Sequence, residues 1–231
     1  MRYILAVLSF LGFLQATAVT AQNGPVVIEL FTSQGCSSCP PADAMLHDLA
    51  KRDDVIALAL HVDYWDYLGW RDEFAHPAFS HRQSQYAHTW RKRTVFTPQM
   101  VIQGGEYMAG NQAATILQEI SRAQGRPARA EIEATRQGGR AAITIRPLTG
   151  AQAASVYLVR YTPEATVSIE RGENAGRDIT YVNIVRDWVL AAEWDGRRAI
   201  SFTPNDLGDD AWVVIVQEGT TGPILAAQQL Q

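Results

Sequence analysis

The sequence contains little cysteine and no long basic segment. Two of its 231 residues are cysteines, and a chain of this length can bury an adequate apolar core without a disulfide. The formal net charge is −4, and the densest basic cluster is the short run Arg91-Lys92-Arg93. Such a short cluster is typical of a solvated helix end, so we expect no nucleic-acid partner.

Long apolar runs are also scarce, and the run at the N-terminus is typical of a signal peptide. Met1-Arg2 is followed by an apolar stretch from Tyr3 to Leu14 and by small residues that end at Ala21. This pattern predicts cleavage after Ala21, and the stretch is too short for a convincing membrane helix. We therefore expect a periplasmic or secreted protein without a membrane span, in a compartment where disulfides persist.

The two cysteines lie together as Cys36-Ser37-Ser38-Cys39, between an apolar run and a segment with helical periodicity. A helix N-terminus carries partial positive charge and unpaired N–H groups, which favour a thiolate over a thiol. A disulfide that closes so short a loop stabilises a fold by only about 2 kcal/mol. The spacing therefore favours a redox-active pair, with a structural disulfide and a pair of metal ligands as the alternatives.

Up to about residue 124, strand patterns alternate with helix patterns. Two nearly continuous apolar runs predict buried strands at 26–31 and 55–62, joined by a helix at 41–52. A strand, helix, strand unit of this length predicts a right-handed parallel crossover. Further patterns predict a helix at 78–92, a strand at 99–103 with a short strand after it, and a helix at 112–123.

Beyond Gly125-Arg126-Pro127 the pattern changes to short strands that are separated by turn residues. These strands are predicted at 130–135, 141–146, 155–161, 181–185, 199–203, 212–217 and 224–228. Their spacing suggests a β-sandwich. We therefore expect a signal peptide at 1–21, one domain at 22–125 with an aromatic-rich insert at 64–93, and a second domain at 129–231.

Two polar residues are candidates for a site around the cysteines. Parallel strands bring their carboxyl ends to one edge of a sheet, which places His61 near Cys36. His61 could act as a base or stabilise a thiolate, or it could be a hydrogen-bonded structural residue. Glu29, inside the first apolar run, could take the proton of Cys39, or it could lie at an exposed edge or pair with an arginine.

Exposure should separate the roles of the two cysteines. The prolines at positions 40 and 41 are tolerated only in the first turn of a helix, so the helix begins at or just before Cys39. Cys36 is then the outer, nucleophilic sulfur and Cys39 the inner, resolving sulfur. Because Gly35 has no side chain, we expect Cys36 to be open to a large partner.

The order of these parts resembles thioredoxin over residues 25–124: strand, Cys-x-x-Cys, helix, strand, helical region, Thr-Pro, strand, Gly-Gly and helix. The resemblance implies a cis peptide bond at Pro98 facing the cysteines, and contacts of Thr97 with a substrate backbone. More closely, the chain is similar to an uncharacterised family of secreted bacterial proteins with a thioredoxin-like domain and a C-terminal β extension. The segments that carry this similarity are 29–41, 61–70, 86–87, 97–99 and 171–174.

Two groups of residues have open interpretations. Most aromatic residues of the insert should pack in the core or between domains, but some, such as Trp65, could form a wall of a substrate cleft. A polar cluster in the β region could be a salt-bridged loop or could dock against the catalytic edge. Its members are Arg171, Glu173, Asn174, Arg177 and Arg186.

Together these features predict an α/β thioredoxin-like domain followed by an all-β sandwich-like domain. The predicted function is an exported thiol-disulfide oxidoreductase that forms a mixed disulfide at Cys36, which Cys39 resolves. Its partners should be thiols or disulfides of proteins or small molecules, with no cofactor and no resident metal. The alternatives are a copper carrier that uses the cysteines and His61, and a binding module with a vestigial dithiol.

Overall fold

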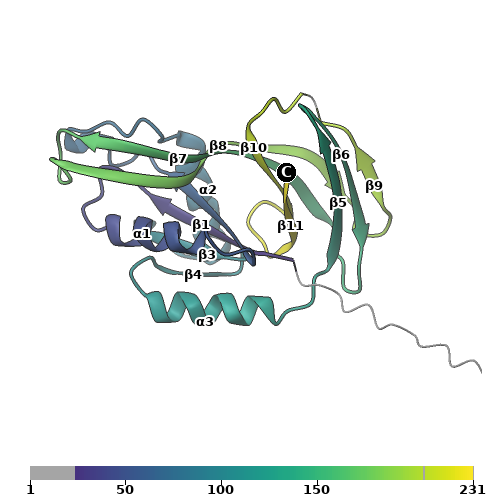
Figure 1. Ribbon diagram of the computed structural model, residues 1–231. Coiled ribbons are helices and arrows are strands. Elements are labelled where there is room, and N and C mark those ends of the chain that lie inside the picture. Colours follow the sequence, from purple (N-terminus) through teal and green to yellow (C-terminus); the bar gives the residue numbers. More distant parts are fainter. Residues whose placement is uncertain (1–23, 205, 231) are drawn as a thin grey trace, which may run out of the picture.

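The structure is a computed structural model that describes residues 24–204 and 206–230 (Figure 1). The expected signal peptide at 1–21 lies outside these residues. Across the described part of the chain, no helix is long and apolar enough to span a membrane.

The first half of the chain contains the elements that carry the cysteines. They are β1 (Val26–Thr32), α1 (Pro40–Leu49), β2 (Val55–His61), a short 3-10 helix (Asp66–Leu68), α2 (Pro77–Thr89), β3 (Gln99–Ile102), β4 (Glu106–Ala109) and α3 (Ala113–Gln124). Strands β1 and β2 are parallel and pair from Val26 with Val55 to Thr32 with His61, so the predicted parallel pair is confirmed. Every residue of these two strands is buried, as their continuous apolar runs indicate.

The second half consists of strands. They are β5 (Ala130–Gln137), β6 (Arg140–Pro147), β7 (Ala154–Ile169), β8 (Arg177–Trp194), β9 (Ile200–Phe202), β10 (Ala211–Gln217) and β11 (Ile224–Leu230). Strands β7 and β8 form a long antiparallel hairpin that pairs from Ala154 with Trp194 to Ile169 with Arg177. The predicted runs at 155–161 and 181–185 are thus only parts of two much longer strands.

The prediction of an α/β thioredoxin-like domain followed by an all-β sandwich-like domain is wrong. Within the described residues, eight strands from both halves form one mixed sheet in the order β11-β10-β7-β8-β2-β1-β3-β4, and β5, β6 and β9 form a second sheet. The join is a parallel contact between β8 and the outer edge of β2, at Ile184 and Ala59. An apolar strand such as β2 leaves unpaired backbone groups at its edge, and β8 covers them. We call the mixed sheet the large sheet.

Helices cover both faces of the large sheet near the cysteines. On one face, α1 and α3 pack their apolar residues, including Leu46 and Ile116, against alternate residues of β1 such as Ile28 and Leu30. On the other face, Phe79 and Tyr86 of α2 pack against a core that includes Phe31. Because side chains alternate along a strand, neighbouring residues of β1 and β2 face different helices. This alternation decides which polar residues can reach the cysteines.

Candidate functional site

Cys36 and Cys39 form a disulfide at the N-terminal end of α1. Pro40 begins the helix and Cys39 is its N-cap residue, as the sequence predicts. The backbone oxygen of Cys39 accepts hydrogen bonds from the N–H groups of Ala42 and Asp43, at 2.8 and 3.1 Å. Cys39 is fully buried and Cys36 is only 3% exposed, so the expected open approach to Cys36 is not found in this structure.

The residues expected to contact a substrate gather beside the disulfide. The peptide bond between Thr97 and Pro98 is cis, as the thioredoxin resemblance implies. Pro98 lies beside the first turn of α1: a Cβ atom at position 110 would be 3.0 Å from the Cβ of Pro98 and 2.8 Å from that of Ala42. The indole Nε1 of Trp65 donates to Oγ1 of Thr97 at 2.7 Å, and a Cβ on Gly35 would lie 3.2 Å from the Cβ of Trp65. Trp65 therefore connects the cysteine loop to the Thr97 loop.

Glu29 pairs with an arginine and does not lie on the α1 side of β1. Arg82 of α2 donates to both of its carboxylate oxygens, at 2.6 and 2.9 Å, and the hydroxyl of Tyr86 donates at 2.6 Å. All three side chains are buried. Strand alternation directs Glu29 toward α2, whereas Ile28 and Leu30 face α1, so Glu29 is not placed to exchange a proton with Cys39.

His61 is a buried residue with a carboxylate partner. Its Nδ1 atom lies 2.7 Å from Oδ2 of Asp72, and its ring makes edge contacts with Phe74 and Tyr181. Burial by itself raises the pKa of Asp72. The charge of His61 and a hydrogen bond from its ring have the opposite effect, as do hydrogen bonds from the backbone N–H groups of Gln34 and Phe74. These interactions outweigh burial, so the pKa of Asp72 is lowered. The carboxylate of Asp72 therefore accepts from Nδ1 of His61 and fixes the orientation of the ring.

Asp43 is the carboxyl group that the structure places behind the disulfide. It lies one helical turn after Cys39 in α1, so the two side chains are neighbours on one helix face. Burial raises the pKa of Asp43 from its ordinary value of 3.8 to about 7, although His61 and a hydrogen bond from Thr32 oppose this shift. Oγ1 of Thr32 donates to Oδ1 of Asp43 at 2.8 Å, and Oδ2 has no hydrogen-bond partner among residues 24–204 and 206–230.

The region around the disulfide holds further buried polar atoms without hydrogen-bond partners in the described part of the chain. They are Nε2 of Gln34, Oδ2 of Asp43, Nε2 of His61, Oδ1 of Asn174 and the hydroxyl of Tyr181. Buried polar groups in folded proteins are nearly always hydrogen-bonded, and exceptions concentrate where chemistry occurs. These atoms belong to residues of the cysteine loop, of α1, of β2 and of the β7–β8 hairpin.

The turn of the β7–β8 hairpin covers the cysteine loop from outside. We call residues 170–176 the hairpin tip. Nδ2 of Asn174 donates to the backbone oxygens of Gln34 and Cys36, each at 2.9 Å. Figure 1 shows the hairpin reaching from the second half of the chain to the end of the molecule that carries α1. Of the two interpretations of the polar cluster at 171–186, docking is thus supported for Asn174, which contacts the loop that carries the cysteines.

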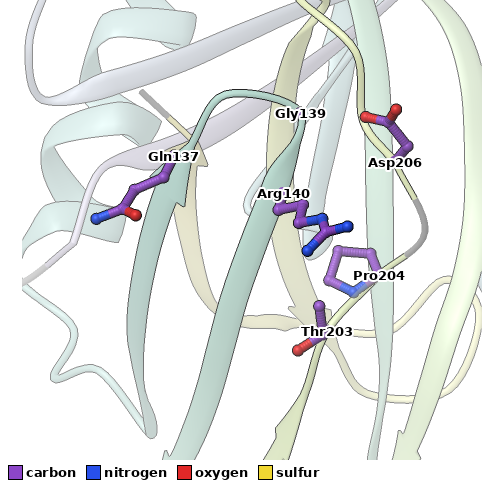
Figure 2. A pocket seen from close by; sticks show the side chains of 6 residues that line it. All are labelled: Gln137, Gly139, Arg140, Thr203, Pro204 and Asp206. Carbon is purple, nitrogen blue, oxygen red and sulfur yellow. The ribbon is translucent and has the colours of Figure 1, made fainter.

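Neither of two surface pockets includes the cysteines. One pocket of about 510 Å³ lies in the second half of the chain; Figure 2 shows its lining residues Gln137, Gly139, Arg140, Thr203, Pro204 and Asp206. Another, of about 310 Å³, lies between α2 and β8 and includes Arg82 and Trp188. The described residues contain no group of three or more His, Cys, Asp or Glu side chains that could hold a metal ion.

Sequence reasoning missed three residues of this region. Asp43 had a local signal, because it follows Cys39 by four positions and shares the buried side of α1 with Ala42 and Leu46. Asp72 gave no such signal, because its partner His61 lies eleven positions away on another element. Asn174 belongs to a polar cluster and to a segment that carries the family similarity, but neither identifies its partners in the cysteine loop, which lie more than a hundred positions away.

Comparison with known proteins gives a family but no activity. A crystal structure of an Agrobacterium tumefaciens protein is similar to this chain, with a TM-score of 0.78, 29% identity, and coverage of 91% of this chain and 96% of the other. HBP35 of Porphyromonas gingivalis has a similar fold, with a TM-score of 0.59, 16% identity, and coverage of 90% of this chain and 74% of the other. No curated protein matches the sequence. The family described as "Protein of unknown function (DUF1223)" matches residues 27–217, and the chain belongs to this family.

Proposed function

We propose that this protein is an exported thiol-disulfide oxidoreductase whose Cys36–Cys39 pair alternates between disulfide and dithiol. The proposal rests on one arrangement above all: a disulfide at a helix N-terminus with the buried carboxyl of Asp43 one turn behind it. The helix end favours the thiolate that exchange requires. A bridge across so short a loop adds only about 2 kcal/mol to stability, which is little reason to keep it as a staple.

The exchange uses the two sulfurs in sequence. A substrate thiolate attacks Sγ of Cys36, the bond between the two cysteines breaks, and Cys39 leaves as a thiolate. The product is a mixed disulfide between the substrate and Cys36. In the reverse direction the Cys39 thiolate attacks Cys36, restores the internal disulfide and releases the substrate thiol.

Asp43 is the proposed proton donor and acceptor for Cys39. Its pKa of about 7 means that both protonation states are populated near neutral pH. A protonated Asp43 can give its proton to the leaving Cys39 thiolate, and an ionised Asp43 can take it back before the resolving attack. For Glu29 the sequence left open this role and pairing with an arginine, and its carboxylate is paired with Arg82 on the other face of the sheet.

The substrates are proposed to be thiols or disulfides of proteins or of small molecules. Trp65 and Thr97 are half-buried beside the disulfide and are joined by a hydrogen bond, so they offer an edge where a substrate chain can lie. Export is proposed from the N-terminal pattern at 1–21, and an exported compartment supplies disulfide-bonded partners.

A trapping experiment tests the function. The full-length protein with Cys39→Ser should accumulate mixed disulfides with exported proteins, because the resolving thiol is missing. The matched control is Cys36→Ser, which lacks the attacking thiol and should trap nothing above background. Non-reducing gels followed by release with dithiothreitol measure the adducts. If Cys39→Ser traps no more than Cys36→Ser, and the wild type fails to accelerate insulin reduction by dithiothreitol, the proposal is wrong.

A further inference from the structure

The hairpin tip contacts the loop that carries Cys36, the cysteine that a substrate sulfur would have to reach. Its residue Asn174 is 1% exposed, although the other residues of the tip are exposed. The amide nitrogen of Asn174 donates two hydrogen bonds to the cysteine loop, one to the backbone oxygen of Gln34 and one to that of Cys36. A single side chain thus attaches the tip to the loop by hydrogen bonds.

The hairpin tip also lies close to Trp70. A Cβ on Gly172 would lie 3.3 Å from the Cβ of Trp70, so the tip backbone passes close to this residue. The indole Nε1 of Trp70 in turn donates to Oε1 of Gln34 at 2.7 Å. Gln34, Trp70 and the tip are therefore connected to one another and to the backbone of the cysteine loop, in which Cys36 is only 3% exposed.

We propose that the hairpin tip is an autoinhibitory cover that must lift before Cys36 can exchange, and that Asn174 is its latch. This inference rests on the proposed function for its biological meaning. Disulfide exchange requires direct access of a thiolate to a sulfur atom, and the covered state gives a protein substrate no such access. The cover therefore sets how readily the disulfide reacts.

The tip can lift without unfolding the hairpin that carries it. The strand pairing ends at Ile169 and Arg177, and the ends of β7 and β8 are held by a separate apolar cluster that includes Phe74, Val167 and Tyr181. The turn beyond that cluster contacts the cysteine loop through Asn174. Opening the turn breaks two side-chain hydrogen bonds and leaves the large sheet intact.

A small reductant measures access directly. Dithiothreitol attacks Cys36 as a thiolate, displaces Cys39, and then closes to its own cyclic disulfide, so that the protein gains two electrons and two protons. The full chain with Asn174→Ala should be reduced about tenfold faster than the wild type, because the latch bonds are gone and the covered state leaves backbone oxygens of the loop unpaired. Asn174→Asp keeps the shape but has no N–H donor, so it should be faster by a similar factor.

The matched control is Thr180→Ala in the same hairpin. Thr180 is exposed, and its hydroxyl forms a hydrogen bond of 2.8 Å with the hydroxyl of Thr166 and not with the cysteine loop. The disulfide of the Thr180→Ala protein should therefore be reduced at a rate within twofold of the wild-type rate. Hydrogen exchange should show faster exchange at residues 170–176 in Asn174→Ala, with protection of β1 retained. If both Asn174 variants are reduced at the wild-type rate, or if protection of β1 is lost with that of the tip, the latch is refuted.

Failure of the cover and failure of the proposed function give different results. Faster reduction of Asn174→Ala supports the cover; if at the same time no variant catalyses insulin reduction and Cys39→Ser traps no more than Cys36→Ser, the oxidoreductase is refuted. Catalysis by the wild type with unchanged rates in both Asn174 variants supports the oxidoreductase and refutes the cover.

Discussion

Replacing Asp43 by asparagine should flatten the pH dependence of stability. The pKa of Asp43 is about 7 in the folded protein and should return to about 3.8 on unfolding. Between these values the folded state keeps a proton that the unfolded state releases, so the free energy of unfolding falls as pH rises. From pH 5 to pH 8 this group alone should remove about 2.5 kcal/mol of stability. Asparagine does not titrate, so Asp43→Asn should lack this loss.

Urea denaturation of the oxidised protein at pH 5, 6.5 and 8 measures the effect. His61 and Asp72 are present in both proteins, so the difference between wild type and variant isolates Asp43 to first order. Asp48→Asn is the control on the same helix: Asp48 is exposed and the hydrogen bond and charge of Lys51 lower its pKa, so it stays ionised over this range. If wild type and Asp43→Asn lose equal stability from pH 5 to pH 8, Asp43 ionises normally and its proposed role with Cys39 fails.

Three further results are expected. Glu29→Gln should lower the free energy of unfolding by about 3–5 kcal/mol in urea denaturation, because the charge of Arg82 is left buried without its partner; a loss below about 1 kcal/mol would show that the pair is not buried in solution. A double-mutant cycle of Trp65→Phe and Thr97→Val, measured by thermal unfolding, should give a coupling energy of about 1 kcal/mol, because the two side chains share one hydrogen bond. A coupling energy of zero would contradict the hydrogen bond between Trp65 and Thr97. In reduced protein, Cys36 should react with iodoacetamide faster than Cys39, because Cys39 lies under the first helical turn. The two rates can be measured separately in the variants Cys39→Ser and Cys36→Ser, and equal rates would contradict the assignment of nucleophilic and resolving roles.

Local patterns were sufficient for the elements around the cysteines. The apolar runs at 26–31 and 55–62 predicted β1 and β2, and the prolines after Cys39 placed the start of α1 correctly, because these signals act within a few residues. The same patterns failed for β7 and β8, whose outer halves carry polar and exposed residues. Those halves are strands because each pairs with the other along its length, and pairing is not visible in a short window.

Side-chain direction explains why Glu29 pairs with an arginine, which is one of the alternatives that the sequence leaves open. A carboxylate inside an apolar strand predicts a buried acid, but the sequence does not say which face of the sheet it joins. In the structure Glu29 faces α2 and meets Arg82, which is 53 positions away. Asp43 reaches the inner side of the disulfide because it lies on α1 itself, one turn from Cys39.

The sequence by itself determined a cysteine pair at a helix N-terminus, a parallel strand pair before and after it, and a Thr-Pro step ahead of a third strand. Each of these follows from residues that are neighbours in the chain, where backbone preference and hydrophobic periodicity act directly. Only the tertiary structure decided that β8 joins the edge of β2, that Asp43 has a raised pKa, and that Asn174 donates to the backbone oxygen of Cys36. These depend on burial and on contacts between distant segments, which arise only when the whole chain has packed.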